Sequence, residues 1–236
     1  MQKINLYGVW IHSVPLQEAV VKALNPRKLP CLTVTPNALM LDAARREPRY
    51  ASLLNRATLS LPDGYGVLLA ATKKGTPLRE RVAGIDFGEE ILHQAAKRGL
   101  RVFLLGGRIG VARQAAKRLT AQIPNLKICG TDHGYFAKKG EENERVLRYI
   151  RACKPDILFV CFGFPRQELW SAQSRHRLPS LRLIACLGGS LDVWAGNRKR
   201  APAFLARHGL EWAWRMLQEP RRLMGLPALA RIALGI

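Results

Sequence analysis

Several features that define large protein classes are missing from this sequence. Its five cysteines are odd in number and form no Cys-x-x-Cys pair, which argues against disulfides and zinc ligands and predicts buried thiols in a reducing compartment. No apolar run approaches the roughly 18 residues of a transmembrane helix, and the first residues lack a signal-peptide pattern. We therefore expect a cytoplasmic protein.

Common ligand-binding signatures are also missing. The chain contains no Asp-x-Asp, the usual carboxylate clamp for a metal–nucleotide complex, and no Gly-x-Gly-x-x-Gly or P-loop. These absences weigh against a nicotinamide oxidoreductase. A nucleic-acid-binding protein remains the alternative of another class, although no helix-turn-helix, zinc finger or aromatic RNA-binding pattern is present.

Negative charge is scarce as well. The 236 residues include 38 Lys and Arg against 17 Asp and Glu, so the formal net charge is +21. Such a balance favours a polyanionic partner, which could be nucleic acid, a phosphorylated ligand or an anionic membrane surface. At 48% hydrophobic residues, the chain can still bury a sizeable core.

The hydrophobic pattern predicts an α/β fold. A small β-hairpin is expected over residues 4–12, and buried strands alternate with helices after it. This order indicates a Rossmann-like, mostly parallel six-stranded sheet with helices on both faces. The expected strands are 31–35, 57–61, 102–105, 126–130, 157–161 and 183–187.

Asp63 is the most informative single residue. It follows the short strand at 57–61 in a Pro-Asp-Gly turn with apolar neighbours on both sides. Ligands of open α/β sheets bind past the carboxyl ends of strands, where a carboxylate that has lost solvation can act as a general base. Good turn chemistry explains the same three residues without any function.

Other polar groups also follow strands, and this clustering favours a site. Thr35 and Asn37 lie between a strand and a helix, where Asn37 could simply be the helix N-cap. Gly106 and Gly107 form a tight strand-to-helix link whose backbone N–H groups suit a pyrophosphate. The remaining candidates are Arg81, the pair Asp132 and His133, the run Arg166, Gln167 and Glu168, and Asp192. Capping explains the Asp132–His133 pair equally well, and Arg81 could merely be a solvated basic residue.

The composition changes after residue 195. Residues 196–236 are rich in arginine and contain Trp212 and Trp214 among aliphatic residues, which suits helices that lie in a membrane interface or pack on the sheet. We predict an α/β catalytic core at 1–195 and a basic helical appendage at 196–236.

Eight short motifs occur in order and span nearly the whole chain. The motifs are Thr35-Pro36-Asn37, Leu61-Pro62-Asp63-Gly64, Glu80-Arg81-Val82-Ala83-Gly84, Leu104-Leu105-Gly106-Gly107, His133-Gly134-Tyr135-Phe136, Gly163-Phe164-Pro165-Arg166-Gln167-Glu168, Gly188-Gly189-Ser190-Leu191-Asp192, and Arg200-Ala201-Pro202 through Gly209-Leu210-Glu211-Trp212. Together they resemble the WecG/TagA/CpsF family of bacterial glycosyltransferases.

This resemblance implies an inverting enzyme of cell-envelope polymer synthesis that is peripheral at the inner face of the plasma membrane. The best-known members transfer N-acetylmannosamine from UDP to undecaprenyl-diphosphate-linked N-acetylglucosamine, as in wall teichoic acid synthesis. Relatives that use UDP-N-acetylmannosaminuronic acid or UDP-glucose make those donors the alternative. No cofactor or metal is expected. The sequence leaves the oligomeric state open and allows a homo-oligomer.

The resemblance also assigns roles to residues. It implies Asp63 as catalytic base, with Thr35 and Asn37 at the sugar pocket. We predict that Thr35 is catalytic together with Asp63, and that Glu168 and Asp192 bind substrate. Arg81, Gln167, Arg215 and Arg222 are implied as substrate-binding residues, and the appendage is implied to close over UDP and touch the membrane. Two departures are notable: Arg166 replaces a common Lys, and an apolar run follows Arg222 where relatives often continue with basic residues.

Overall fold

The structure is a computed structural model that describes residues 2–25, 28–202, 204–205, 213–214 and 225–234. Arg215 and Arg222, which were predicted to bind substrate, lie outside the described residues. Among the residues that are described, none of the helices has the length and hydrophobicity that a membrane crossing needs.

A six-stranded parallel sheet forms the centre of the described structure, as predicted. Its strand order is β4-β3-β8-β7-β5-β6, and all of its pairings are parallel. All six strands therefore end at the same edge of the sheet. The strands are β3 (Cys31–Val34), β4 (Leu59–Ser60), β5 (Arg101–Gly106), β6 (Lys127–Asp132), β7 (Ile157–Cys161) and β8 (Leu183–Cys186).

The predicted N-terminal hairpin is also present. Strands β1 (Lys3–Leu6) and β2 (Val9–His12) pair antiparallel as a separate two-stranded sheet. Tyr7 and Gly8 form its turn, both with positive φ, and the Asn5 side chain accepts the N–H of Gly8 at 3.0 Å. The hairpin contacts β4 and thereby supports the strand that leads to Asp63.

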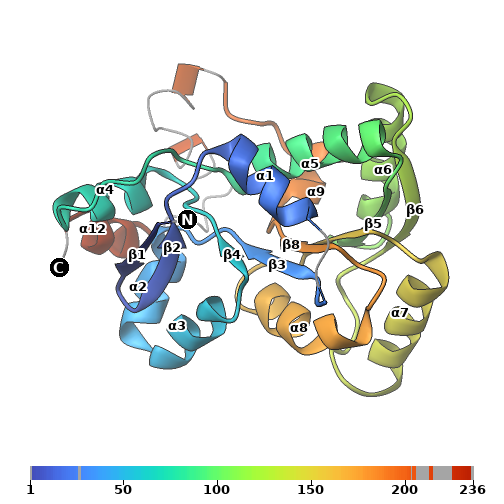
Figure 1. Ribbon diagram of the computed structural model, residues 1–236, viewed down its shortest axis with the longest axis horizontal. Helices are drawn as coiled ribbons and strands as arrows, with labels where there is room; N and C mark the ends of the chain where they lie inside the picture. The colour runs from blue at the N-terminus through green and yellow to red at the C-terminus, as the bar shows by residue number, and fades with distance from the viewer. Residues whose placement is uncertain (1, 26–27, 203, 206–212, 215–224, 235–236) are drawn as a thin grey trace.

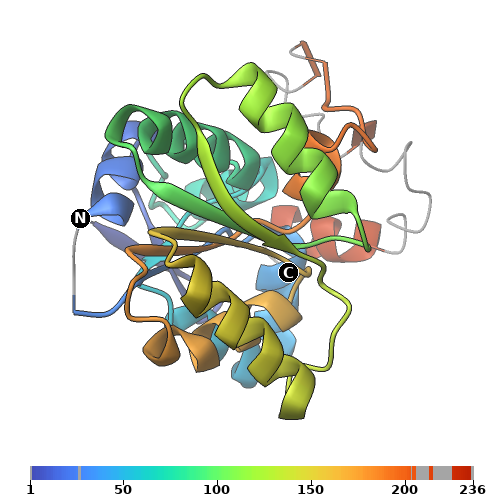
Figure 2. The same ribbon diagram turned by 90° about the vertical axis from the view of Figure 1, so that its right-hand side faces the viewer.

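Helices cover both faces of the sheet (Figures 1 and 2). One layer contains α1 (Leu16–Leu24), α5 (Gly84–Arg98), α6 (Val111–Gln122) and α9 (Ser190–Trp194). The other contains α2 (Ala38–Arg46), α3 (Pro48–Asn55), α4 (Tyr65–Lys73), α7 (Gly140–Cys153), α8 (Arg166–Ser174), which the short 3-10 helix η1 (Arg175–Arg177) follows, and α12 (Leu226–Leu234).

The core is divided by the sheet because side chains alternate along each strand. Leu104 and Phe159 pack into the first layer, while Phe103 and Leu158 pack into the second. These four side chains are fully buried. Burying a side chain of this size contributes about 1.5–3 kcal/mol, so strands that are apolar on both faces belong in the middle of such a sandwich.

Two elements differ from the prediction. Strand β4 is only two residues long because the turn that follows α3 extends to Ala57, whose N–H donates to the Leu54 carbonyl at 3.1 Å. Helix α3 was not predicted. Its signal in the sequence is Pro48 at the first helical position, where the missing N–H of proline costs nothing.

The cysteines behave largely as predicted. All five are free thiols, and Cys31, Cys161 and Cys186 are buried in or next to the sheet, whereas Cys129 and Cys153 are partly exposed.

The end of the chain returns to the core. Helix α12 packs against α2 and α4 (Figure 1), and Arg231 donates two hydrogen bonds to the buried carboxylate of Asp42, at 2.9 and 2.7 Å. The last part of the segment predicted as an appendage is therefore docked on the α/β core. The division into two domains remains a prediction.

Candidate active site

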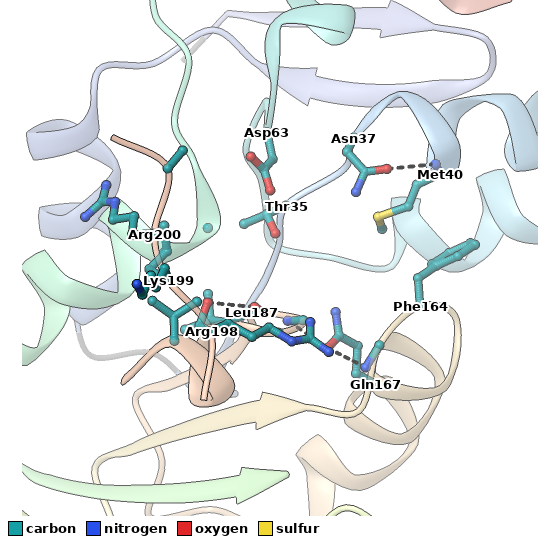
Figure 3. Close-up of a pocket in the computed structure, with 18 residues that line it drawn as sticks. Thr35, Asn37, Met40, Asp63, Phe164, Gln167, Leu187, Arg198, Lys199 and Arg200 are labelled. Carbon is teal, nitrogen blue, oxygen red and sulfur yellow. Dashed lines mark hydrogen bonds between the residues drawn. The ribbon is translucent and has the colours of Figure 1, made fainter. Parts of the chain in front are cut away.

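A cleft opens at the carboxyl ends of β3, β4, β7 and β8 (Figure 3). Ligands of open α/β sheets usually bind at this edge of the sheet. Its volume is about 240 Å³. Thr35, Asn37, Asp63 and Gln167, four of the residues predicted from the sequence, line this one cavity. The strand ends that were separate in the sequence thus meet as expected.

Asp63 lies in a turn and in the cleft at the same time. Its N–H donates to the Pro36 carbonyl at 2.9 Å, which joins the loop after β4 to the loop after β3. Gly64 follows with a φ of +92°, which glycine adopts without strain. The turn chemistry therefore serves to hold the carboxylate in the cleft, so the two interpretations of Pro-Asp-Gly are compatible.

Thr35 lies next to Asp63 in Figure 3. Its side chain is almost fully buried, and its hydroxyl donates to the Cys186 carbonyl at 3.4 Å. Gly84, at the start of α5, packs so closely that an added Cβ would lie 3.0 Å from the Thr35 hydroxyl. This packing fixes the Thr35 side chain at the floor of the cleft.

Asn37 both caps a helix and faces the cleft. Its Oδ1 accepts the N–H of Met40 at 3.1 Å, so it is the N-cap of α2. The cap uses the oxygen, and Figure 3 shows the amide nitrogen pointing into the cavity. Asn37 can therefore donate a hydrogen bond to a bound ligand without giving up its structural role.

Gln167 is held by three hydrogen bonds. Its Oε1 accepts the N–H groups of Gly163 at 3.2 Å and Gly188 at 3.0 Å, and its Nε2 donates to Glu168 Oε1 at 2.7 Å. Gln167 lines the cleft from the end of β7, across from Asp63. It presents an amide group in a fixed orientation.

Glu168 does not line the cleft, contrary to the expectation that it contacts substrate. Its side chain is 1% exposed and lies behind Gln167, and burial raises its carboxyl pKa to about 7. The reason for the difference is helical geometry, because successive residues on a helix point about 100° apart. When Gln167 faces the cleft, Glu168 faces the interior.

Basic residues that were not among the predicted site residues form another wall of the cleft. Arg198, Lys199 and Arg200 follow α9 directly and line the cavity, and Figure 3 shows Arg198 extending across it toward Gln167. The available signal was the run of three cations just after the last strand-end helix. Their position makes the cavity suitable for an anion such as a diphosphate.

Arg81 lies near the cleft but does not line it. Its guanidinium is 3.7 Å from the carboxylate of Asp86 and 5.6 Å from the centre of the Tyr65 ring. The Asp86 carboxylate also accepts a hydrogen bond from Arg200. Arg81 and the cationic wall are therefore connected through one shared carboxylate.

Asp192 acts here through its backbone. Its side chain does not line the cleft, but its carbonyl accepts the N–H groups of Asn197 at 2.9 Å and Arg198 at 3.2 Å. These bonds turn the chain after α9 so that Arg198 reaches the cavity. Asp192 therefore positions a cleft residue through its backbone, and a substrate contact by its side chain stays a prediction.

Gly106 and Gly107 lie at the other half of the sheet edge, outside this cavity. The N–H of Gly107 donates to the Cys161 carbonyl at 3.2 Å, and its carbonyl accepts the N–H of Gly134. An added Cβ on Gly106 would lie 2.4 Å from the Cys161 carbonyl oxygen. These glycines allow close backbone packing, so the expectation that the Gly107 N–H holds a pyrophosphate has no support in this geometry.

The other candidates also lie away from the cavity. Asp132 accepts the N–H of His133 at 2.8 Å and forms an ion pair with Arg145 at 3.1 Å, which fits the capping interpretation. Arg166 is exposed in the first turn of α8. Within the described part of the chain, no group of three or more His, Cys, Asp or Glu side chains is arranged to hold a metal ion.

Comparison with known proteins gives consistent matches. Residues 4–234 match the glycosyl transferase WecG/TagA/CpsF family. A protein of Bacillus spizizenii W23, named N-acetylglucosaminyldiphosphoundecaprenol N-acetyl-beta-D-mannosaminyltransferase, is 36% identical over 197 residues, covering 82% of this chain and 75% of its own. Proteins of the same name from Bacillus subtilis 168 and Staphylococcus aureus MW2 are 33% and 34% identical, over 86% and 83% of this chain and 79% and 75% of theirs.

Proposed function

Because the chain belongs to the WecG/TagA/CpsF family of glycosyl transferases, we propose that it transfers N-acetylmannosamine from UDP to undecaprenyl-diphosphate-linked N-acetylglucosamine. The names of the similar Bacillus and Staphylococcus proteins describe transfer of this sugar to this acceptor. The product is an intermediate of a cell-envelope polymer of the wall teichoic acid type.

The observation that carries this proposal is the composition of the cleft. Asp63, Thr35 and Asn37 lie on one side of it, and Arg198 and Lys199 lie on another. Transfer from a sugar-nucleotide donor needs a proton acceptor on one side of the site and cations on another. The acceptor hydroxyl must lose a proton while a diphosphate leaves with its negative charge.

The proposed reaction is a single in-line displacement. The acceptor hydroxyl oxygen attacks the anomeric carbon of the donor sugar, and Asp63 takes the proton from that hydroxyl. The bond from the anomeric carbon to the diphosphate oxygen breaks, and UDP leaves with the bonding electrons. Attack from the face opposite the leaving group inverts the anomeric configuration.

Cationic side chains stabilise the departing UDP in this proposal. Arg198 and Lys199 line the cleft, and Arg81 is connected to it through Asp86. Arg215 and Arg222, which lie outside the described residues, are predicted to add to this charge. Thr35, Asn37 and Gln167 are proposed to bind the hydroxyl or acetamido groups of the sugar.

We expect the reaction to need no divalent cation, since arginine and lysine can neutralise the leaving diphosphate. Turnover with excess EDTA should equal turnover without it. A loss of activity in EDTA that Mg²⁺ or Mn²⁺ restores would overturn this part of the proposal.

A peripheral position at the inner face of the plasma membrane would give the enzyme access to its lipid-linked acceptor. Three exposed leucines support this proposal: Leu39 on α2, Leu69 on α4 and Leu226 on α12, helices that contact one another. Apolar side chains on a protein of net charge +21 suit an anionic membrane surface. Co-sedimentation with anionic but not neutral vesicles would support it.

A donor screen tests the function. The purified protein is incubated with a short-chain lipid-diphosphate N-acetylglucosamine acceptor and with UDP-N-acetylmannosamine, UDP-N-acetylmannosaminuronic acid or UDP-glucose, and UDP release and product mass are measured. We expect turnover with UDP-N-acetylmannosamine. Turnover with only one of the other donors would keep the reaction class and change the sugar, and no turnover with any donor would overturn the proposal.

A further inference from the structure

The first step of the argument concerns the amide of Gln167, whose two ends have different surroundings. Two backbone N–H groups, from Gly163 and Gly188, point at Oε1, and a carboxylate oxygen of Glu168 accepts from Nε2 at 2.7 Å. If the amide were rotated by 180°, its NH₂ would face two donors and its oxygen would face a carboxyl oxygen. All three contacts therefore favour one orientation.

The bond between Gln167 and Glu168 is unusual in its spacing. Neighbouring residues on a helix do not face each other, and side-chain pairs normally form three or four positions apart. Here the Nε2 group of Gln167 meets the carboxylate of the next residue in the first turn of α8. Nε2 carries two hydrogens, so one remains for a group in the cleft after Glu168 has accepted the other.

The burial of Glu168 is costly. The side chain is 1% exposed, and its Oε2 has no hydrogen-bond partner among the described residues. The Gln167 Nε2 group donates to its other oxygen, Oε1, at 2.7 Å, and burial raises the carboxyl pKa to about 7. A buried carboxyl without an ion pair destabilises a fold, and an apolar residue of similar size would often be tolerated better.

We infer that Glu168 is a positioning residue that fixes the Gln167 amide with Oε1 toward the backbone and one Nε2 hydrogen toward the donor substrate. Glu168 itself does not contact substrate. The inference rests on the proposed function, since it assigns a purpose to Gln167 in the cleft, and it explains why the fold retains a buried carboxyl beside the site.

The test is a double-mutant cycle on donor turnover. Glu168→Leu removes the acceptor and keeps the volume, Gln167→Ala removes the positioned amide, and the double variant combines them. We expect Glu168→Leu to lower kcat/KM about tenfold, the usual effect of losing a hydrogen bond to a charged group, without lowering the melting temperature. In the Gln167→Ala background, the same change should lower kcat/KM less than about twofold, because coupled residues are not additive.

Two further variants make the cycle specific. Glu168→Gln retains an oxygen that can accept from Nε2, so its kcat/KM should lie within about threefold of the parent enzyme. Glu141→Leu removes an exposed carboxylate that also lies in the first turn of a helix, α7, and should leave kcat/KM unchanged. If Glu168→Leu fails to fold, Glu168→Met replaces it, because the unbranched side chain adapts to irregular space.

The inference is overturned if Glu168→Leu retains full activity, or if its loss is equally large with and without Gln167. A spectroscopic measurement separates this from failure of the proposed function. The two side-chain amide proton signals of Gln167, assigned by their absence in Gln167→Ala, should be widely separated in the ¹H dimension of a ¹H–¹⁵N correlation spectrum of the parent protein. In Glu168→Leu this separation should become smaller. Unchanged signals would overturn the inference even if the transferase activity is confirmed, and changed signals would support it even if no donor is turned over.

Discussion

Two aspartates of this protein have different surroundings, because one faces a cavity and the other is paired with arginine inside the fold. Asp63 lies in the cleft at the carboxyl end of β4, beside Thr35 and across from cationic residues. Asp42 lies on α2, fully buried, where Arg231 of α12 binds both of its oxygens and Arg46 lies 3.1 Å away. Both are single carboxylates in a strongly basic chain, yet only one of them faces a cavity.

The difference concerns where the arginines act. At Asp42 they contact the carboxylate itself, and the hydrogen bonds from Arg231 hold its pKa below the usual range. The α2–α12 contact is therefore a closed ion-pair network. In the cleft, the cationic wall faces the cavity, where a phosphorylated ligand can enter. The same residue types stabilise the fold in one region and are available for a substrate in the other.

Asp63→Asn should give the largest effect on activity. Removing the proposed general base should lower turnover by about a hundredfold or more, which is at least about 2.7 kcal/mol in the activation barrier. The free energy of unfolding should change by less than about 0.5 kcal/mol, as for a substitution outside the core. Initial rates and urea unfolding on the same preparation measure both, and near-normal turnover would remove Asp63 from this role.

Asp42→Asn should show the reverse pattern. The asparagine leaves Arg45, Arg46 and Arg231 around a neutral buried group, and we expect the free energy of unfolding to fall by about 3 kcal/mol. Turnover per folded molecule should fall much less than in Asp63→Asn. Glu144→Gln is the matched control, because Glu144 has the same two-bond contact with Arg177 at the surface, where water screens ion pairs and they contribute little to stability. Equal losses in both variants would contradict the distinction.

Lowering the pH should reduce the stability contributed by buried His12, beside β4, before it reduces the contribution of the Asp42–Arg231 contact. His12 is buried, accepts the N–H of Ser60 in β4, and has its pKa lowered from 6.5 to about 4, chiefly by burial. The unfolded chain therefore binds a proton at His12 before the folded chain does, so stability falls as the pH drops from about 6.5 toward 4. The Asp42 contribution is lost only below its usual pKa of 3.8, because its folded pKa is lower still.

We expect a loss of about 2 kcal/mol between pH 7.5 and 5 from His12, as the size of its shift implies. The variant His12→Asn keeps an acceptor for the Ser60 N–H but does not titrate in this range. Denaturant unfolding at each pH should show a weaker dependence in the variant. An identical pH dependence in both proteins would assign the effect to other groups.

Arg231→Lys should give the smallest effect. Lysine keeps the charge but cannot bind both oxygens of Asp42 in the planar manner of arginine, so we expect a small loss of stability, well below that of Asp42→Asn. Turnover should not change. A loss as large as that of Asp42→Asn would show that the hydrogen-bond geometry, and not the charge, accounts for the whole network.

Much of the site could be predicted because a parallel sheet brings its strand ends together. Thr35 and Asn37 follow β3, Asp63 follows β4 and Gln167 follows β7, and all four line one cleft. What each of them does to a substrate remains a proposal. The prediction was less useful for Gly107, because a glycine-rich turn can serve an anion or close backbone packing, and only the partner of its N–H distinguishes the two.

Other features were outside the reach of sequence patterns. Arg198 lines the cleft because the Asp192 carbonyl turns the chain after α9. The pairing of Asp42 with Arg231 joins residues 189 positions apart. The Asp42–Arg231 contact has no local signal, because it depends on how distant segments pack. The run of cations that includes Arg198 is visible in the sequence, but the cavity that it lines is not.

The sequence by itself determined the alternation of strands and helices apart from α3, the family, and the strand ends at which polar residues gather, because these follow from local periodicity and short motifs. The tertiary structure decided which of those polar groups face a cavity and which are already paired. It placed Glu168 behind Gln167 and Asp42 beneath Arg231. The physical reason is that burial and hydrogen-bond partners are properties of packing between distant segments, which no local pattern contains.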